Sequence, residues 1–568
     1  MNNTYTEIKK SGATFTPVGL ADFLSEKILS QIESSSDELI VLDPACGDGS
    51  LLSAMSRMGG KRIMSLIGYD TNSKYLEQAE ALMNKMSGEK KHKFICEDFL
   101  TVCPSVTNLF TENLCQEFAD IVIANPPYVR TQVLGAARAQ QLAHDFNLTG
   151  RIDLYYPFLM AMTNALKKGG ILGVITSNRY ISTKSGGDIR KFLLDNYDII
   201  EIIDLGDTKL FNAAVLPAIF IGKKKLHKNF SSKVGKYTSI YEAEETHKNE
   251  EGNTMCSHKN IFDILRSEKS GCYAVGEQQY MFKRGLLKHS TDKTSIWQMS
   301  DAHENKWIDT INAHAAFRIK DKFKVRVGIK SCADNIFISQ LWDKEGLEIE
   351  ETLLCSMISQ ENIEPWAIDK DSMLHVLYPH YSKDGKRQVF DIEKFPLASH
   401  YLQRHREQLE ERKYLIKAGR KWYEYWVPQN PAFWKMPKVV FPDISVRPRF
   451  CFDESGAIVN GNCYWMCAQN EEERSLLLLI EGVSNSSVMV RYHDLCFNNK
   501  LYSGRRRYLA QYVEQYPMPS PKLESSKQIV SLVEKLNNTL DAREKEILAS
   551  EIDNLVKISF GITDCLDT

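Results

Sequence analysis

The fold of the first half of the chain is decided by residues 41–50, which read VLDPACGDGS. The apolar start of this stretch predicts a buried strand, and the turn at Gly47 and Gly49 predicts the opening of a helix. Small residues in such a turn let the backbone approach a ligand closely, as in nucleotide-binding strand–helix turns. The stretch therefore predicts a ligand site at the carboxyl end of a strand.

Short apolar runs alternate with helix-like stretches on both sides of this turn. The runs that predict strands are residues 39–42, 63–69, 93–95, 121–124, 170–176, 199–204 and 218–222. Amphipathic stretches at residues 72–85 and 155–166 predict helices between them. Alternation of this kind predicts an α/β domain with a largely parallel sheet.

The remaining chain is less regular. Residues 223–252 are charged and predict a surface hairpin or linker, residues 393–414 predict a helix, and an amphipathic helix is expected after residue 522. At 568 residues the chain is long enough for two or three domains. Its 13 cysteines lack the paired spacing of a zinc site, so no metal is expected.

The composition limits the partners. No run of about 18 apolar residues occurs, which excludes a membrane span, and the polar N-terminus predicts a cytoplasmic location. A net charge of −2 gives no global attraction to nucleic acid. Residues 401–450, however, hold eleven Lys/Arg against five Asp/Glu, with aromatic residues interleaved. This basic patch is where affinity for nucleic acid is expected.

Carboxylates around the first turn indicate the ligand. Asp43 and Asp48 would repel a pyrophosphate, whereas the positive amino acid head of S-adenosylmethionine would suit them; an unoccupied turn is the alternative. Asp70 ends the next strand, where it can accept from ribose hydroxyls. It can also cap a helix, although Asn72 could take that role. Asp98 follows the third strand and can accept from an adenine amine, with Phe99 packed on the ring.

The fourth motif carries the reaction. A fully apolar strand runs into Asn125-Pro126-Pro127-Tyr128. The Asn125 side-chain oxygen and the Pro126 carbonyl can both accept from one amine, and the prolines hold these acceptors rigidly. Held in this way, the amine nitrogen is pushed toward tetrahedral geometry, and its freed lone pair can attack a methyl group. Tyr128 offers a flat face for stacking a base.

The order of these motifs, with Thr16-Pro17 ahead of them, resembles the gamma-class (Taq-type) N6-adenine DNA methyltransferases. The resemblance is specific over residues 11–225 and looser over about 270–560. It implies a Rossmann-like class I methyltransferase domain with a mixed, mostly parallel seven-stranded sheet, then an α+β target-recognition domain and a C-terminal helical segment. The expected bounds are 1–240 for the methyltransferase domain, 241–275 for a linker or insertion, 276–521 for target recognition and 522–568 for the helical segment.

The resemblance also implies a role for each site residue. The expected contacts with S-adenosylmethionine are Thr16, Asp43, Ala45, Gly47, Asp70, Asp98, Phe99, Asn125, Pro127 and Phe158. The expected catalytic turn is Asn125, Pro126, Pro127 and Tyr128, with Tyr128 and Phe211 stacking on an adenine that has rotated out of the duplex. Methyl transfer is direct, so Cys46 is expected to be a packing residue. The family's basic residue near Ala214 is absent.

Three basic clusters are candidates for contact with double-stranded DNA. They are Arg420 and Lys421, Arg447 and Arg449, and Arg505, Arg506 and Arg507. A solvated basic face over an aromatic core is the alternative for each. One chain that carries both catalysis and recognition is expected to act as a monomer. About ten residues precede the first cofactor motif, so no nuclease is expected on this chain, and a restriction endonuclease would be a separately encoded partner.

Other substrates share this chemistry. The same turn occurs in methyltransferases that act on adenine in RNA and on glutamine in release factors, because an amide nitrogen poses the same problem as an arylamine. The long second half with its basic patch favours DNA. A catalytically silent DNA-binding subunit is a further alternative, against which the intact Asn125–Tyr128 turn argues.

Overall fold

The structure is a computed structural model. It describes residues 15–33, 36, 38–86, 91–103, 116–128, 135–146, 153–211, 216–227, 235–243, 256–289, 291–339, 342, 349–497 and 504–562. The chain forms two compact units, Met1–His303 with Cys496–Ser503 and Glu304–Leu495 with Gly504–Thr568. None of the helices in the described ranges is long and apolar enough to cross a membrane.

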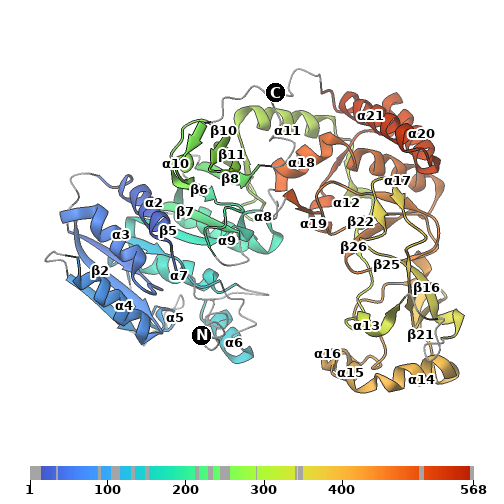
Figure 1. Ribbon diagram of the computed structural model, residues 1–568, viewed down its shortest axis with the longest axis horizontal. Helices are drawn as coiled ribbons and strands as arrows, with labels where there is room; N and C mark the ends of the chain where they lie inside the picture. The colour runs from blue at the N-terminus through green and yellow to red at the C-terminus, as the bar shows by residue number, and fades with distance from the viewer. Residues whose placement is uncertain are drawn as a thin grey trace. The chain divides into compact units, whose positions relative to one another are not determined.

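The first unit is built on the predicted sheet (Figure 1). Its core strands are β1 (Leu39–Asp43), β2 (Ile63–Asp70), β3 (Lys91–Cys96), β4 (Ala119–Ala124), β5 (Leu166–Ser177), β6 (Tyr197–Asp204) and β7 (Pro217–Lys224). Their order is β3-β2-β1-β4-β5-β7-β6. Pairing is parallel from β3 to β5, and β7 runs antiparallel to both of its neighbours. Each of the seven predicted strands is present, and the α/β fold is confirmed.

Helices cover both faces of these strands. They are α2 (Val18–Leu29), α3 (Ser50–Gly59), α4 (Ser73–Asn84), α5 (Phe99–Val102), α6 (Ala136–Asp145), α7 (Tyr155–Ala165), α8 (Arg179–Ser182) and α9 (Gly187–Asn196). Successive strand residues point to opposite faces. Val41 therefore packs in one core with residues of α2 and α3, whereas Leu42 packs in a second core with residues of α7 and α9.

The sheet continues beyond the seven predicted strands. The additional elements are β8 (Lys236–Glu242), β9 (Cys256–His258), α10 (Ile261–Leu265), β10 (Gly271–Val275), β11 (Gln278–Lys288) and β12 (Gln298–Ser300). Past β6 the order is β8-β11-β10-β9, with β12 paired to β11, which makes twelve strands. Among the described residues, strand β8 lies in the stretch 223–252 that is predicted as a surface hairpin or linker, and β9, α10 and β10 lie in the stretch 241–275 that is predicted as a linker or insertion. The charged composition hid β8, whose partners β6 and β11 are distant in sequence.

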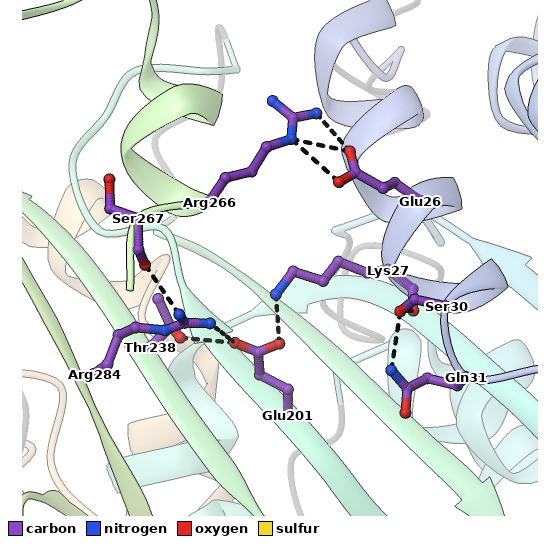
Figure 2. Close-up of polar contacts among 9 residues, drawn as sticks. All are labelled: Glu26, Lys27, Ser30, Gln31, Glu201, Thr238, Arg266, Ser267 and Arg284. Atoms are coloured by element: carbon purple, nitrogen blue, oxygen red, sulfur yellow. Dashed lines mark hydrogen bonds and ion pairs between the residues drawn. The ribbon is translucent and has the colours of Figure 1, made fainter. Parts of the chain in front are cut away.

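A buried carboxylate joins this extension to the core. Glu201 of β6 accepts hydrogen bonds from Lys27 of α2, at 2.8 Å, and from Thr238 of β8, at 2.7 Å (Figure 2). Arg284 of β11 lies 3.7 Å from the same carboxylate. The Glu201 side chain is only 6% exposed, and buried charges are tolerated when paired in this way. The extension is therefore an integral part of the first unit.

The second unit is α+β. Its strands are β13 (Phe317–Arg318), β14 (Arg326–Val327), β15 (Ile338–Ser339), β16 (Leu354–Ile358), β17 (Ile363–Glu364), β18 (Ala367–Ile368), β19 (Leu374–Leu377), β20 (His380–Lys383), β21 (Lys386–Val389), β22 (Lys438–Pro442), β23 (Ile444–Ser445), β24 (Cys451–Asp453), β25 (Ile458–Val459), β26 (Cys463–Cys467), β27 (Arg506–Arg507) and β28 (Pro517–Met518). Two four-stranded sheets, β14-β26-β22-β24 and β15-β19-β16-β25, form its centre.

The helices of this region differ in part from prediction. They are α11 (Ala302–His314), α12 (Ile319–Lys322), α13 (Asp334–Phe337), α14 (Pro396–Arg404), α15 (Arg406–Glu410), α16 (Lys413–Lys417), α17 (Glu471–Ser484), α18 (Ser487–Phe497), α19 (Ala510–Val513), α20 (Glu524–Asn538) and α21 (Ala542–Ser559). The helix predicted over 393–414 is broken, because His405 and Arg412 have non-helical backbone angles. The helices α20 and α21 pack on α17 within the unit.

Candidate active site

The carboxyl ends of β2, β1 and β4 are neighbours in the sheet. Asp70 ends β2, Asp43 ends β1, and Asn125 directly follows β4. Ligands of open α/β sheets bind outside the carboxyl ends of the strands. The fold therefore brings three of the predicted motifs to one edge of the sheet.

The turn after β1 is shaped for close approach. Gly47 and Gly49 have positive φ angles of 52° and 80°, a conformation that other residues adopt with strain. A side chain at Gly49 would lie 2.9 Å from the side chain of Ala79 on α4. The backbone of Cys46 donates to the Tyr69 carbonyl at 2.8 Å, which fixes the turn against β2. Both glycines are thus required by the local structure.

Asp43 is fully buried in this turn. Its Oδ1 accepts from the backbone of Ala45 at 3.1 Å, while Oδ2 has no hydrogen-bond partner in the part of the chain that the structure describes. Burial, with Asp70 and Asp48 nearby, raises the pKa of Asp43 to about 8. A cationic group placed against Oδ2 would stabilise the charged carboxylate. The arrangement therefore fits a ligand that carries an ammonium group.

Asp70 accepts one of its hydrogen bonds from the same turn. One of its oxygens accepts from the backbone of Gly47 at 3.0 Å and the other from that of Asn72 at 2.8 Å. Burial raises the pKa of this carboxyl as well. The cap of α4 is Asn72, whose side chain accepts from Lys74. Asp70 is therefore not needed as the helix cap, which was the alternative to its ribose role.

Asp98 and Phe99 follow β3 as predicted, in two different environments. Asp98 caps α5 by accepting from the backbone of Leu100 at 3.0 Å, and it forms an ion pair with Arg138 of α6. Phe99 is only 1% exposed and packs edge-on against Tyr69, with ring centroids 5.1 Å apart. The carboxylate is thus accessible, whereas the phenyl ring belongs to the core.

The turn after β4 holds its amide by two hydroxyl groups. Asn125 is 9% exposed, and its Nδ2 donates to the Thr16 hydroxyl at 3.0 Å. The Tyr128 hydroxyl donates to Asn125 Oδ1 at 2.8 Å. Burial raises the pKa of Tyr128 above its usual value, so the phenol stays protonated and remains a donor. Pro126 is buried and Pro127 is half-buried, so this turn is packed as well as rigid.

The other predicted site residues are placed around this edge or within the core. Thr16 lies just before α2 and is buried. Phe158 of α7 and Phe211, which follows β6, are buried in the two cores on opposite faces of the sheet. Burial raises the pKa of the Cys46 thiol, as expected for a packing residue. Ala214 lies outside the described residues.

Comparison with known proteins supplies the family. A Type II methyltransferase of Aneurinibacillus aneurinilyticus, M.BanIII, is 42% identical over 98% of this chain and 97% of its own length. The chain belongs to the Type II methyltransferases. A second member, M.BstVI from Geobacillus stearothermophilus, is 24% identical over 91% of the chain and 92% of that protein.

Two family models match parts of the first unit, and one solved structure shares the fold. Residues 62–211 match the model of the Eco57I restriction-modification methylase, and residues 7–93 match that of the rRNA methyltransferase AviRa. The second match ends before Asp98 and Asn125. A Type IIL restriction-modification enzyme, MmeI, solved in complex with DNA, shares the fold over 99% of this chain and 74% of its own, with a TM-score of 0.59 at 13% identity. As a member of the Type II methyltransferases, the protein is an S-adenosylmethionine-dependent DNA methyltransferase.

Some of the methyltransferase's basic side chains are bound within the chain. Arg506 is 5% exposed and pairs with both carboxylate oxygens of Asp494, at 2.7 and 2.9 Å. Arg449 donates to the carbonyls of Gln360 and Ile363. Such side chains, predicted from their charge alone to contact DNA, hold the second unit together. Arg420 is engaged in the same way, by the carbonyls of Tyr425 and Trp426.

The remaining basic candidates are exposed to solvent in whole or in part. Arg447 and Arg505 are exposed and lie next to the paired strands β23 and β27, while Lys421 is exposed beside Tyr423. Arg507 pairs with Asp443 at 2.5 Å, yet its side chain remains 39% exposed. Successive side chains along β27 point to opposite faces. Arg505 and Arg507 therefore remain more exposed than Arg506, which lies on the buried face.

Sequence reasoning missed four residues near the site. Arg138 contacts Asp98, and Asn178 and Tyr241 contact Asp204 at the end of β6. Asp204 could have been found from the sequence, because it ends a predicted strand as Asp43 and Asp70 do. Tyr241 could not have been found, because its strand β8 was itself not predicted.

Proposed function

We propose that this Type II methyltransferase is a site-specific, adenine-specific DNA methyltransferase of the gamma class, which modifies N6 of an adenine rotated out of duplex DNA. The observation that carries the proposal is the Asn125–Tyr128 turn after β4, one strand away from the buried Asp43 at the end of β1. The two positions supply acceptors for an amine and a counter-charge for a cationic cofactor.

The residues at the carboxyl ends of β1 and β2 fit S-adenosylmethionine. Bound there, this compound supplies an electrophilic methyl group on a sulfonium sulfur. The buried Oδ2 of Asp43, which has no hydrogen-bond partner among the described residues, accepts from an ammonium group, and the glycines of the turn let the protein backbone approach the ligand closely. Asp70 is proposed to hold the ribose and Asp98 the adenine of the cofactor, beside Ala45, Pro127 and Phe158. Thr16 completes this proposed set, and Phe99, whose ring is buried, is proposed to pack beneath the adenine.

The turn after β4 is proposed to prepare the target amine. Asn125 Oδ1 and the Pro126 carbonyl accept its two hydrogens, which frees the nitrogen lone pair from the ring. These acceptors are preorganised, because the prolines fix the backbone and Thr16 contacts the amide. An adenine within the duplex cannot reach such a pocket and must rotate out of the duplex. This rotation breaks stacking and base pairing, which costs a few kcal/mol. Stacking on Tyr128 and Phe211 offsets part of this cost.

The second unit is proposed to read the DNA sequence. Its exposed basic side chains Arg447, Arg505, Arg507 and Lys421 are the candidates for contact with phosphates and base edges. Catalysis and recognition then lie on one chain, and we propose that it acts as a monomer. A restriction endonuclease of the same system would be a separate protein in the same cytoplasm.

Variants of Asn125 test the catalytic part. Asn125→Ala removes the acceptor and is expected to abolish transfer of a labelled methyl group to duplex DNA, while DNA binding is retained. Asn125→Asp keeps an acceptor oxygen and is expected to retain more transfer than Asn125→Ala. Equal loss in both variants, or full activity of Asn125→Ala, would contradict the role of this oxygen. Labelling of RNA or polypeptide in place of DNA would contradict the substrate.

A further inference from the structure

The carboxylate of Asp204, at the end of β6, gathers donors from three parts of the first unit. It accepts from the Asn178 side chain, at 3.3 and 3.4 Å, and from the Tyr241 hydroxyl of β8, at 2.7 Å. It also accepts from the backbone of Gly206 at 3.1 Å, two residues further along its own chain. Asp204 is fully buried, so these contacts are shielded from water.

The segment after Asp204 is fastened to the end of β8. Gly206 has φ of 52°, and a side chain there would lie 2.2 Å from the Ile240 carbonyl, so the backbones are in direct contact. Asp207 is 5% exposed and accepts from the backbone of Glu242 at 2.8 Å. Residues 204–207 are thus fixed against the last three residues of β8.

The far end of the same connection is also held. The backbone of Leu205 donates to the Pro217 carbonyl at 3.0 Å, and that of Asn178 donates to the Leu216 carbonyl at 2.9 Å. Both ends of the connection from β6 to β7 are therefore held beside Asn178 and Asp204. Phe211, proposed above to stack on the target base, lies on this connection.

We infer that Asp204 and Tyr241 are positioning residues for the target-base side of the pocket. The carboxylate fixes the start of the segment, Tyr241 fixes the carboxylate, and Phe211 is presented in one place as a result. Strand β8, outside the seven-strand core, thereby takes part in base binding. This inference rests on the proposed role of Phe211.

Tyr241→Phe tests the inference, because it removes one hydroxyl and keeps the ring. Tyr237→Phe is the matched control, since Tyr237 lies on the same strand and its hydroxyl contacts Ser239. Base rotation is followed in a duplex with 2-aminopurine at the target position, whose fluorescence rises when the base leaves the stack, and kcat/KM is measured on the same duplex with adenine at that position. Tyr241→Phe is expected to reduce this rise and to lower kcat/KM for DNA about tenfold, as one hydrogen bond to an ion would. Binding of S-adenosylmethionine should be unchanged.

The outcomes separate this inference from the function on which it rests. Wild-type fluorescence and kcat/KM in both Tyr241→Phe and Asp204→Asn would overturn the inference. Equal losses in Tyr241→Phe and Tyr237→Phe, or weaker binding of S-adenosylmethionine, would show a general effect on the sheet and overturn it too. If Phe211→Ala leaves the fluorescence rise intact, the proposed role of Phe211 fails. If Phe211→Ala lowers it and Tyr241→Phe does not, only the positioning role fails.

Discussion

The hydroxyl of Tyr128 donates a hydrogen bond to the side-chain oxygen of Asn125, over a distance of 2.8 Å. This oxygen is the acceptor proposed for the target amine, so the protein's own hydroxyl occupies one of the two acceptor positions open to the substrate. The Tyr128 ring, in contrast, is proposed to stack on the base. One residue therefore has two separable effects on the reaction, which its hydroxyl and its ring exert in opposite directions.

Substitution of Tyr128 separates these effects. Tyr128→Phe keeps the ring and removes the competing donor, and we expect kcat/KM for DNA to be maintained or raised a few-fold. Tyr128→Ala removes the stacking surface, which is worth about 1–3 kcal/mol per base, and should lower kcat/KM by about 5- to 150-fold. Steady-state kinetics on a short duplex measure both. A loss in Tyr128→Phe as large as that in Tyr128→Ala would contradict this division of roles.

Binding of S-adenosylmethionine should release a proton through Asp43. Burial raises the pKa of this carboxyl to about 8, so it is mostly protonated at pH 7 in the free protein, and an adjacent ammonium group would lower that pKa. Titration calorimetry in buffers of different ionisation enthalpy should show release of up to about one proton at pH 7. Asp43→Asn should abolish the release, whereas the control Asp48→Asn should keep it. Proton-independent binding by the native protein would refute the assignment.

The stability of the second unit should fall as pH rises through the range in which Glu481 ionises. Glu481 is fully buried on α17, and burial raises its pKa from 4.5 to about 8. The folded state binds the Glu481 carboxyl proton more tightly than the unfolded state does. The resulting contribution to the free energy of unfolding is therefore present below pH 4.5 and is lost toward pH 8.

Glu481→Gln should remove this loss. The amide can donate to Asn537 Oδ1, which is buried and has no hydrogen-bond partner among the described residues. In denaturant unfolding at pH 8.5, the free energy of unfolding of the variant should exceed that of the native protein by about 2–4 kcal/mol. At pH 5 the difference should be much smaller. The exposed Glu472→Gln on the same helix is the control and should change neither value. A gain independent of pH would rule out this explanation.

DNA affinity should depend on the exposed arginines and not on the buried ones. Arg447→Ala and Arg505→Ala are each expected to weaken binding and to reduce the slope of log K against log salt by about 0.9, the value for one lost phosphate contact. Arg506→Ala should instead lower the unfolding temperature, because it leaves Asp494 without its bidentate partner. Unchanged salt slopes in the first two variants would place the DNA contact elsewhere.

The sequence predicted the first unit well where local patterns decide structure. Strands β1 and β4 are apolar runs bounded by turn residues, so their position and their polar ends could be read directly. Strand β9 has three residues, and β8 (KYTSIYE) has a single aliphatic residue and lies in a charged stretch, so neither has a pattern that stands out from a loop. Their pairing is decided by partners far away in the chain.

Side-chain roles were predictable only in part for the same reason. Asp43, Asp70 and Asn125 were found because each follows a buried strand. Charge alone could not tell Arg505, which is exposed, from Arg506, whose partner Asp494 lies on a separate helix. The burial of Phe99 against Tyr69 likewise depends on a contact between helix α5 and strand β2.

The most direct test of the central claim identifies the base that is modified. Duplex DNA is incubated with the purified protein and S-adenosylmethionine labelled in its methyl group, then digested to nucleosides and separated by mass spectrometry. The account predicts label in N6-methyladenine, and its loss in Asn125→Ala. Label in a methylated cytosine, or in no nucleoside of DNA that the protein binds, would contradict it.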